Sequence, residues 1–515
     1  MNLTSNRSTC WLCRNIATRA ALFLTLTTLS TTPITAQRVV DLTLERAVEM
    51  AMDDSYQVRR VRLEVERTEK LLQAELAGLK SQVYMNFALP EFEQISQEYY
   101  NFDTGRNEIV DENSRRWQME FSIEQPVILF GYPTNGYLSL NNRVYRYRQF
   151  QEEDSELNYY NRYFVAYQQS LFQPNELKND LEEAELDLMK AELDFQDDAI
   201  EIIYNTARNY NELFELSREA VILQRFVDNL EDALAAANMR AAADSSSAIE
   251  VSQAQVALSN ARSTLQQARS DFRLEAARLK PDLGLSVADS IVIDPTIALN
   301  PIEIDSVRAI ELGMTLRPQL RQLEIRRREN EIDLENVRGR NSFRMDLEIT
   351  YGREMEDPQF SQLMDDPRNS YTVGVRGYLP IWDWGEREAR LEAQKLVIQG
   401  TELSIAQERE EIEISINNTL ANLDEYQRRA LNMRQNLDLA ERVSRQSLAQ
   451  YRGGAISIQD LMRALEQQME TGQNFLEAYM GYRRALLDLQ GMTYYNFEYG
   501  VPVLERYGIQ PVEDN

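Results

Sequence analysis

The chain has 515 residues, a formal net charge of −28, and only 19 glycines and 14 prolines. So few turn-forming residues favour a small number of long elements, and the strong negative charge argues against nucleic-acid binding. The sequence has no histidine, the commonest general base and metal ligand, so hydrolase and zinc-enzyme interpretations become remote. We expect a protein that is not an enzyme and that needs no cofactor.

Residues 1–36 have the features of a secretory signal peptide. Three arginines precede an apolar stretch at 20–29, and small residues lead to Ala36, after which we expect cleavage. Both cysteines, Cys10 and Cys13, lie before the apolar stretch. We therefore expect neither a lipid anchor nor a thiol in the mature chain.

The region that follows opens with a helix that occurs twice. Residues 43–72 match 305–334 in their apolar positions when the chain is compared with itself at an offset of 262. Thr43 and Asp305 are both N-cap types, and the spacing after each is that of an amphipathic helix. We expect an internally duplicated fold. Its parts are a first repeat at 37–290, a second repeat at 291–491 and a C-terminal tail at 492–515.

Strands are expected where polar and apolar residues alternate. Residues 343–351 alternate without error, and so do 117–124; shorter alternating runs lie at 82–89 and 371–376. A period of two indicates a strand with two unlike faces. The repeat offset falls from 262 to 210 across this part, so the first repeat holds 52 extra residues. We interpret them as an additional hairpin with its turn at 131–136.

Each repeat is expected to end in a long helical hairpin. At an offset of 210, apolar residues spaced by seven in 181–202 fall on those of 391–412, which is typical of supercoiled helices. The only breaks in this periodicity, at 241–247 and 452–457, mark the hairpin tips. The first helix of each hairpin is roughly 65 residues long, which corresponds to about 100 Å.

The strands are the expected membrane part. No run of about 18 apolar residues follows the signal, which excludes a later transmembrane helix, and strands that cross a membrane must form a closed barrel. A soluble sheet is the alternative for any one strand, but the signal and the long helices favour a fold that is mainly α with a β-barrel portion. The expected lipid-facing residues are Phe343, Met345, Leu347 and Ile349. The expected pore-facing residues are Arg344, Asp346, Glu348 and Arg376.

The duplicated order of these features resembles the TolC family of outer-membrane efflux proteins. The features are an opening Leu-x-x-Ala helix at Leu44, a hairpin, the exit Pro-Ile-Trp-Asp-Trp-Gly at 380–385, a Tyr-x-x-Gly tip at Tyr451, and Asp-Leu at Asp460. The resemblance implies a homotrimer with one shared barrel in outer-membrane lipid and one shared helical tunnel in the periplasm. It also implies a periplasmic adaptor and an inner-membrane pump as partners, in an efflux or type I secretion system.

The resemblance assigns roles to two groups of residues. Asp460 corresponds to an acid that lines the narrow periplasmic aperture, with Glu250 as its first-repeat equivalent and Arg463 where the family has a second acid. The alternative is that Asp460 only caps the returning helix, because Ser457 and Asp460 both lie at its start. The expected adaptor-docking tip consists of Tyr451, Gly453, Gly454 and Ile456.

A periplasmic adaptor or a coiled-coil scaffold is the alternative function, since such proteins also carry long helical hairpins. An adaptor would have no membrane-facing strands and no duplicated pair of hairpins. Nothing in the sequence identifies the transported cargo.

Overall fold

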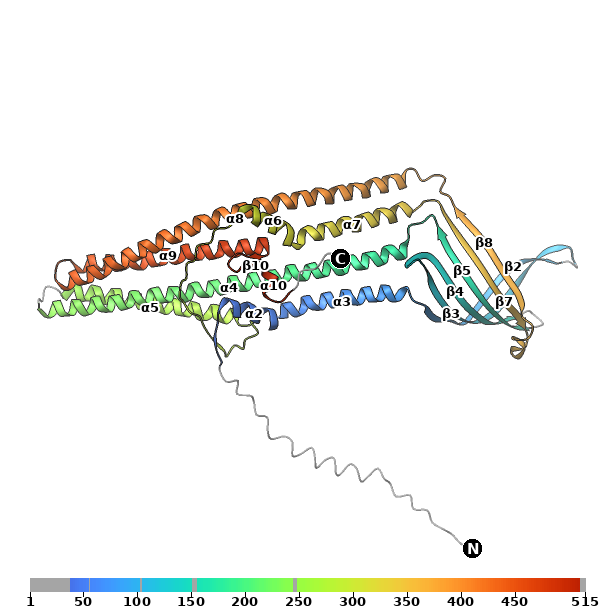
Figure 1. Ribbon diagram of the computed structural model, residues 1–515. Helices are drawn as coiled ribbons and strands as arrows, with labels where there is room; N and C mark the ends of the chain where they lie inside the picture. Colours follow the sequence, from blue (N-terminus) through green and yellow to red (C-terminus); the bar gives the residue numbers. More distant parts are fainter. Residues whose placement is uncertain (1–37, 55, 102–103, 151–154, 244–247, 510–515) are drawn as a thin grey trace, which may run out of the picture.

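The computed structural model describes residues 38–509, apart from 55, 102–103, 151–154 and 244–247. The expected signal peptide and its two cysteines therefore lie outside the described residues. The molecule is a long rod of helices that continues at one end into a tilted β-sheet (Figure 1). Among the residues described, no helix combines the length and the apolar character of a membrane-spanning helix.

The two copies of the opening helix are each built from two segments. They are α2 (Leu44–Asp54) with α3 (Tyr56–Gly78), and α6 (Ser306–Leu316) with α7 (Pro318–Gly339). The expected N-caps are confirmed: the Thr43 side chain accepts from the Arg46 backbone N–H, and Asp305 accepts from that of Val307. Pro318 begins α7 and holds Arg317 extended, which ends α6.

Both helical hairpins are present. The first pairs α4 (Glu176–Ala243) with α5 (Ala248–Leu279), and the second pairs α8 (Glu386–Arg452) with α9 (Ile458–Thr493). At 68 and 67 residues, α4 and α8 each extend about 100 Å. Residues of the expected heptads are buried between the hairpins, among them Ile412, Leu461 and Leu489.

The sheet has six antiparallel strands in the order β2-β3-β4-β5-β7-β8. The strands are β2 (Gln82–Asn101), β3 (Arg106–Leu129), β4 (Tyr132–Phe150), β5 (Ser155–Leu171), β7 (Arg344–Asp357) and β8 (Arg368–Tyr378). The first repeat contributes four of them, so the extra hairpin is confirmed. The predicted position of its turn, 131–136, was wrong. Leu129 already pairs with Tyr132, and the turn is Phe130-Gly131, both with positive φ, as in the tight turns of two-residue hairpins.

Short segments join the two repeats near the middle of the rod. β1 (Val39–Asp41) pairs in parallel with β6 (Ser290–Val292), which lies in the linker between the repeats. The C-terminal segment forms β9 (Tyr495–Asn496), β10 (Val501–Pro502) and α10 (Val503–Arg506).

A short turn of helix, η2 (Phe360–Gln362), lies in the loop between β7 and β8.

Candidate functional site

The two faces of the sheet have opposite chemistry. One face presents large apolar side chains to solvent, including Phe121, Leu140, Val165, Tyr351 and Val373, and the pairing register places most of these side by side across the strands. The opposite face carries polar side chains that crowd one another, and Ser122, Asn141 and Thr350 are buried there. Side chains are crowded on the concave side of a curled sheet and exposed on its convex side. We infer that this sheet is curled, with the polar face on its concave side.

Ion pairs link neighbouring strands on the polar face. Arg143 lies 3.0 Å from Glu120, Arg162 lies 3.8 Å from Glu354, and Arg376 lies 2.8 Å from Glu348. Ser170 donates a hydrogen bond to Asp346 at 2.9 Å. Pairs on adjacent strands are the units that stabilise a sheet. The expected pore-facing residues Arg344, Asp346, Glu348 and Arg376 all lie on this face by register.

The second hairpin tip is a tight turn that depends on glycine. Gly454 has φ +76, and the N–H groups of Gly454 and Ala455 donate to the carbonyls of Tyr451 and Gln450. This arrangement is a Schellman motif, which places a glycine at the left-handed position after a helix. Gly453 and Gly454 are exposed, and Ile456 is half-buried. Tyr451 lies beneath the turn and is fully buried.

Tyr451 joins the two hairpins at their tips. Its hydroxyl donates to Glu250 at the start of α5 over 2.8 Å, and Arg240 from the end of α4 stacks over its ring at 4.6 Å. Arg240 also lies 3.9 Å from Glu250 and donates to the carbonyls of Tyr451 and Ile456. Burial and the hydrogen bond to Glu250 raise the pKa of Tyr451 to about 12, so its hydroxyl keeps the proton that it donates. We call Arg240, Glu250 and Tyr451 the tip cluster.

Replacing Tyr451 with phenylalanine is expected to lower the free energy of unfolding of the tip by about 1 to 3 kcal/mol, because a hydrogen bond to a charged group is lost and Glu250 keeps only Arg240. Hydrogen exchange of amides in residues 449–461 would report the local change. Tyr56→Phe is a matched control, because that ring is exposed. Unchanged protection at the tip in Tyr451→Phe would show that the tip cluster does not hold the hairpins together.

Asp460 lies in the first turn of α9 and is exposed. The Ser457 hydroxyl donates to its carboxylate at 2.7 Å, and the Asp460 N–H donates back to Ser457 at 3.2 Å. These bonds, with the nearby guanidinium of Arg463 at 3.7 Å, lower the pKa of Asp460. Within one subunit the carboxylate therefore completes a helix cap, and its negative charge remains open to solvent.

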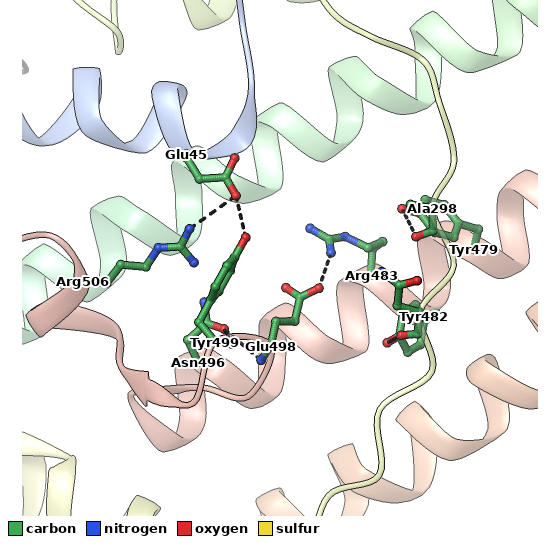
Figure 2. Close-up of polar contacts among 10 residues, drawn as sticks. Glu45, Ala298, Tyr479, Tyr482, Arg483, Asn496, Glu498, Tyr499 and Arg506 are labelled. Carbon is green, nitrogen blue, oxygen red and sulfur yellow. Dashed lines mark hydrogen bonds and ion pairs between the residues drawn. The ribbon is translucent and has the colours of Figure 1, made fainter.

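A third polar region lies between α2, α9 and the C-terminal segment, near the middle of the rod (Figure 1), and Figure 2 shows its contacts. Glu45 of α2 accepts hydrogen bonds from Tyr499 at 3.0 Å and from Arg506 at 3.5 Å, and Arg483 of α9 pairs with Glu498 at 3.0 Å. Burial acts to raise the pKa of Glu45, but the hydrogen bonds and Arg506 outweigh it and lower the pKa. The C-terminal segment thereby ties the start of the first repeat to the last helix of the second.

The fold was compared with solved structures. The CmeC outer-membrane channel of Campylobacter jejuni superposes with a TM-score of 0.64 and 14% identity over 94% of this chain and 92% of that chain. The outer-membrane channel OprN gives 0.63 and 15% over 87% and 89%, and the outer-membrane protein VceC of Vibrio cholerae gives 0.61 and 13% over 87% and 95%. The chain has the fold of the TolC-type outer-membrane channels. No family model and no curated protein matches the sequence.

The structure brings together residues to which the sequence had suggested separate roles. Glu250 and Tyr451 were assigned to an aperture and to a docking tip, yet they share a hydrogen bond. Arg240 was not singled out, although a lone cation in the last turn of a helix before a tip is a candidate partner for an acid in the next helix. Asp460 pairs with Arg463 and Ser457, and within the described part of the chain no hydrogen bond or ion pair links it to the tip cluster.

Proposed function

We propose that this protein is the outer-membrane channel of a bacterial export system, a passive duct and not an enzyme. The observation that carries the proposal is the sheet, whose one face is apolar and exposed and whose other face is polar, attached to helices of about 100 Å. The apolar face would contact outer-membrane lipid, the polar face would line water, and the helices would extend into the periplasm.

Three copies would close one barrel and one tunnel. The sheet is open, with β2 and β8 as its edges, and these two strands run in opposite directions. An antiparallel β8–β2 pair between copies would therefore close a ring, and three sheets of six strands would give 18 strands. A barrel of this size leaves an aqueous channel. The helix edges support the same assembly, because α8 on one side and α3 on the other carry exposed apolar side chains, among them several leucines.

The helical tips would dock a periplasmic adaptor bound to an inner-membrane pump. Behind the tip, a groove of about 790 Å³ runs between α5 and α9 and is lined by Ile249, Val256, Met462 and Met469. Such an apolar groove beside exposed glycines suits an amphipathic partner helix. An adaptor protein, the alternative function, would have neither the duplicated hairpins nor the two-faced sheet found here.

Fractionation followed by a heat-modifiability gel tests the proposal. The protein is expected to pellet with the outer membrane and to migrate as a trimer in mild detergent until it is heated. Recovery as a soluble periplasmic monomer would contradict the channel function.

Asp460 is expected to attract cations to the periplasmic aperture, because three-fold symmetry turns any residue near the axis into a ring of three. Asp460→Ala, alone or with Glu250→Ala, should weaken block of reconstituted channels by trivalent cations. Ser457→Ala is the matched control, since it removes the cap bonds and keeps the carboxylate. If Asp460→Ala lowers thermal stability and leaves the block unchanged, Asp460 is only a cap.

The cap itself should respond to pH. Because the folded-state pKa of Asp460 is below its ordinary value, its contribution to stability is fully present above the ordinary pKa of aspartate, about 3.9, and is lost as the pH falls through the lower folded-state pKa. Wild type and Asp460→Ala should therefore differ in thermal stability at neutral pH and converge at the acid end.

A further inference from the structure

The apolar face of the sheet changes character toward the end that lies away from the helices. Along β3 the residues on this face are, in order, Phe121, Met119, Trp117 and Arg115. Along the strand the side chains change from apolar to indole to guanidinium. This order matches the order of membrane environments, from the hydrocarbon core through the interface to the headgroups. In Figure 1 the helices lie at the opposite end of the sheet, so these residues would lie in the leaflet away from the periplasm.

The pairing register gathers three arginines here. Arg115 of β3 lies directly opposite Arg148 of β4, and Arg146 lies opposite Trp117, two residues from Arg148 on the same face. Like charges placed directly opposite each other are unfavourable in a sheet, and positive charge is therefore concentrated at this place. We call Arg115 and Arg146 the rim arginines.

The rim arginines differ from the arginines of the polar face in their partners. Arg143, Arg162 and Arg376 on that face each pair with a glutamate. Within the described residues no ion pair is found for Arg115 or Arg146. Arg115 instead stacks over the rings of Phe92, at 4.9 Å, and Trp117, at 5.7 Å.

Within the described strands, the acidic residue of this face that lies nearest to Arg146 is Asp357. Its carboxylate already has a hydrogen-bond partner in its own loop. Asp357 of β7 lies opposite Tyr159, which in turn lies opposite Arg146. Its carboxylate accepts a hydrogen bond from the Gln359 N–H at 2.7 Å. The half-buried Arg115 thus stacks on two aromatic rings, and the half-buried Arg146 lies opposite Trp117 in the strand register. Neither positive charge is compensated by those carboxylates.

We propose that the rim arginines bind the phosphate groups of outer-leaflet lipid headgroups. The planar guanidinium matches phosphate with two parallel hydrogen bonds, and a basic cluster beside interfacial aromatics attracts anionic headgroups. The acyl chains of such a lipid would lie on the apolar band below Trp117. This inference rests on the proposed function, because it requires the apolar face to contact the membrane.

Native mass spectrometry of the purified full-length assembly in detergent tests the inference, with diphosphoryl lipid A as the probe and the same lipid after removal of its phosphates as the reference. The wild-type protein is expected to bind the phosphorylated lipid more tightly. The double variant Arg115→Gln/Arg146→Gln should lose about fivefold in affinity for each arginine and keep its affinity for the phosphate-free lipid. Equal binding of the two lipids by the wild type would overturn the inference, whatever the variants do.

Three comparisons sharpen the result. Arg344→Gln/Arg376→Gln removes the same charge from the polar face and should leave the lipid preference unchanged; an equal loss in this control would show that only net charge matters. Arg115→Lys/Arg146→Lys should keep most of the preference. Millimolar inorganic phosphate should compete poorly, and full competition would show a free-anion site instead.

Heat-modifiable trimers that conduct but show no lipid preference would overturn this inference alone, whereas absence of such trimers would contradict the channel function.

Discussion

Leu347→Arg is expected to cost about 2 to 4 kcal/mol of folding free energy in a bilayer. The apolar run of this face begins at Phe343, just before β7, and continues along β7 to Tyr351, followed by Arg353, so Leu347 lies at its centre. An arginine there would place a guanidinium near the midplane of the membrane, far from both interfaces. Urea unfolding in vesicles would measure the cost, and the yield of heat-modifiable trimers should fall with it.

Gln168→Arg is the matched control for this prediction. Gln168 lies on the neighbouring strand, exposed on the polar face and directly opposite Glu348. The same new side chain should therefore be tolerated there, since it gains water and a carboxylate. If Gln168→Arg proved as harmful as Leu347→Arg, or if Leu347→Arg had no effect, the assignment of the apolar face to lipid would be wrong.

Gly454→Val is expected to abolish export while trimers remain in the outer membrane. The backbone at Gly454 has φ +76, which a β-branched residue adopts only with strain, so the turn between α8 and α9 must change shape. The space around the position is open, so the change acts through the backbone and the exposed surface of the tip. Export of a reporter cargo and crosslinking of the adaptor to the tip would measure the effect.

Two further variants separate backbone strain from bulk. Gly454→Asn should retain part of the activity, because asparagine tolerates the left-handed conformation better than other residues do. Ala455→Val places the same side chain at the next exposed position, where φ is not positive, and should be milder. Full export by Gly454→Val with unchanged adaptor crosslinking would place the docking site elsewhere.

Much of the fold was predictable because its elements repeat a simple period. Seven-residue spacing predicted α4 and α8, and N-cap residues such as Asp305 predicted the start of the second opening helix. Alternation predicted parts of β2, β3, β7 and β8, but it did not predict β5. These signals are local, since each follows from how one helix or strand buries one face.

The outer parts of the sheet were less predictable. β2 continues to Asn101 and β3 begins at Arg106, where alternation is weak and a register shift between Ala88 and Glu91 moves the faces by one residue. The turn at Phe130-Gly131 was misplaced because the Gly-Tyr-Pro-Thr-Asn-Gly stretch after Phe130 contains stronger turn residues than the turn itself. Strand pairing overrode that local preference.

The tip cluster could not be predicted because it depends on contacts between the two hairpins. Arg240 and Tyr451 are 211 positions apart and meet only when α4 packs against the second hairpin. In the sequence each looks like an ordinary residue near a helix end. Long-range contacts of this kind require the three-dimensional packing to be known.

The most direct test of the central claim is a disulfide scan between the two edge strands. Single cysteines introduced at exposed positions of β2, such as Phe87, and of β8, such as Val373, would be combined in one chain whose cysteines at 10 and 13 are expected to leave with the signal peptide. If three copies close one barrel through β8–β2 pairs, mild oxidation in the outer membrane should yield crosslinked dimers and trimers on a non-reducing gel. Monomers with only an internal crosslink, or no crosslink at any pair of positions, would contradict it.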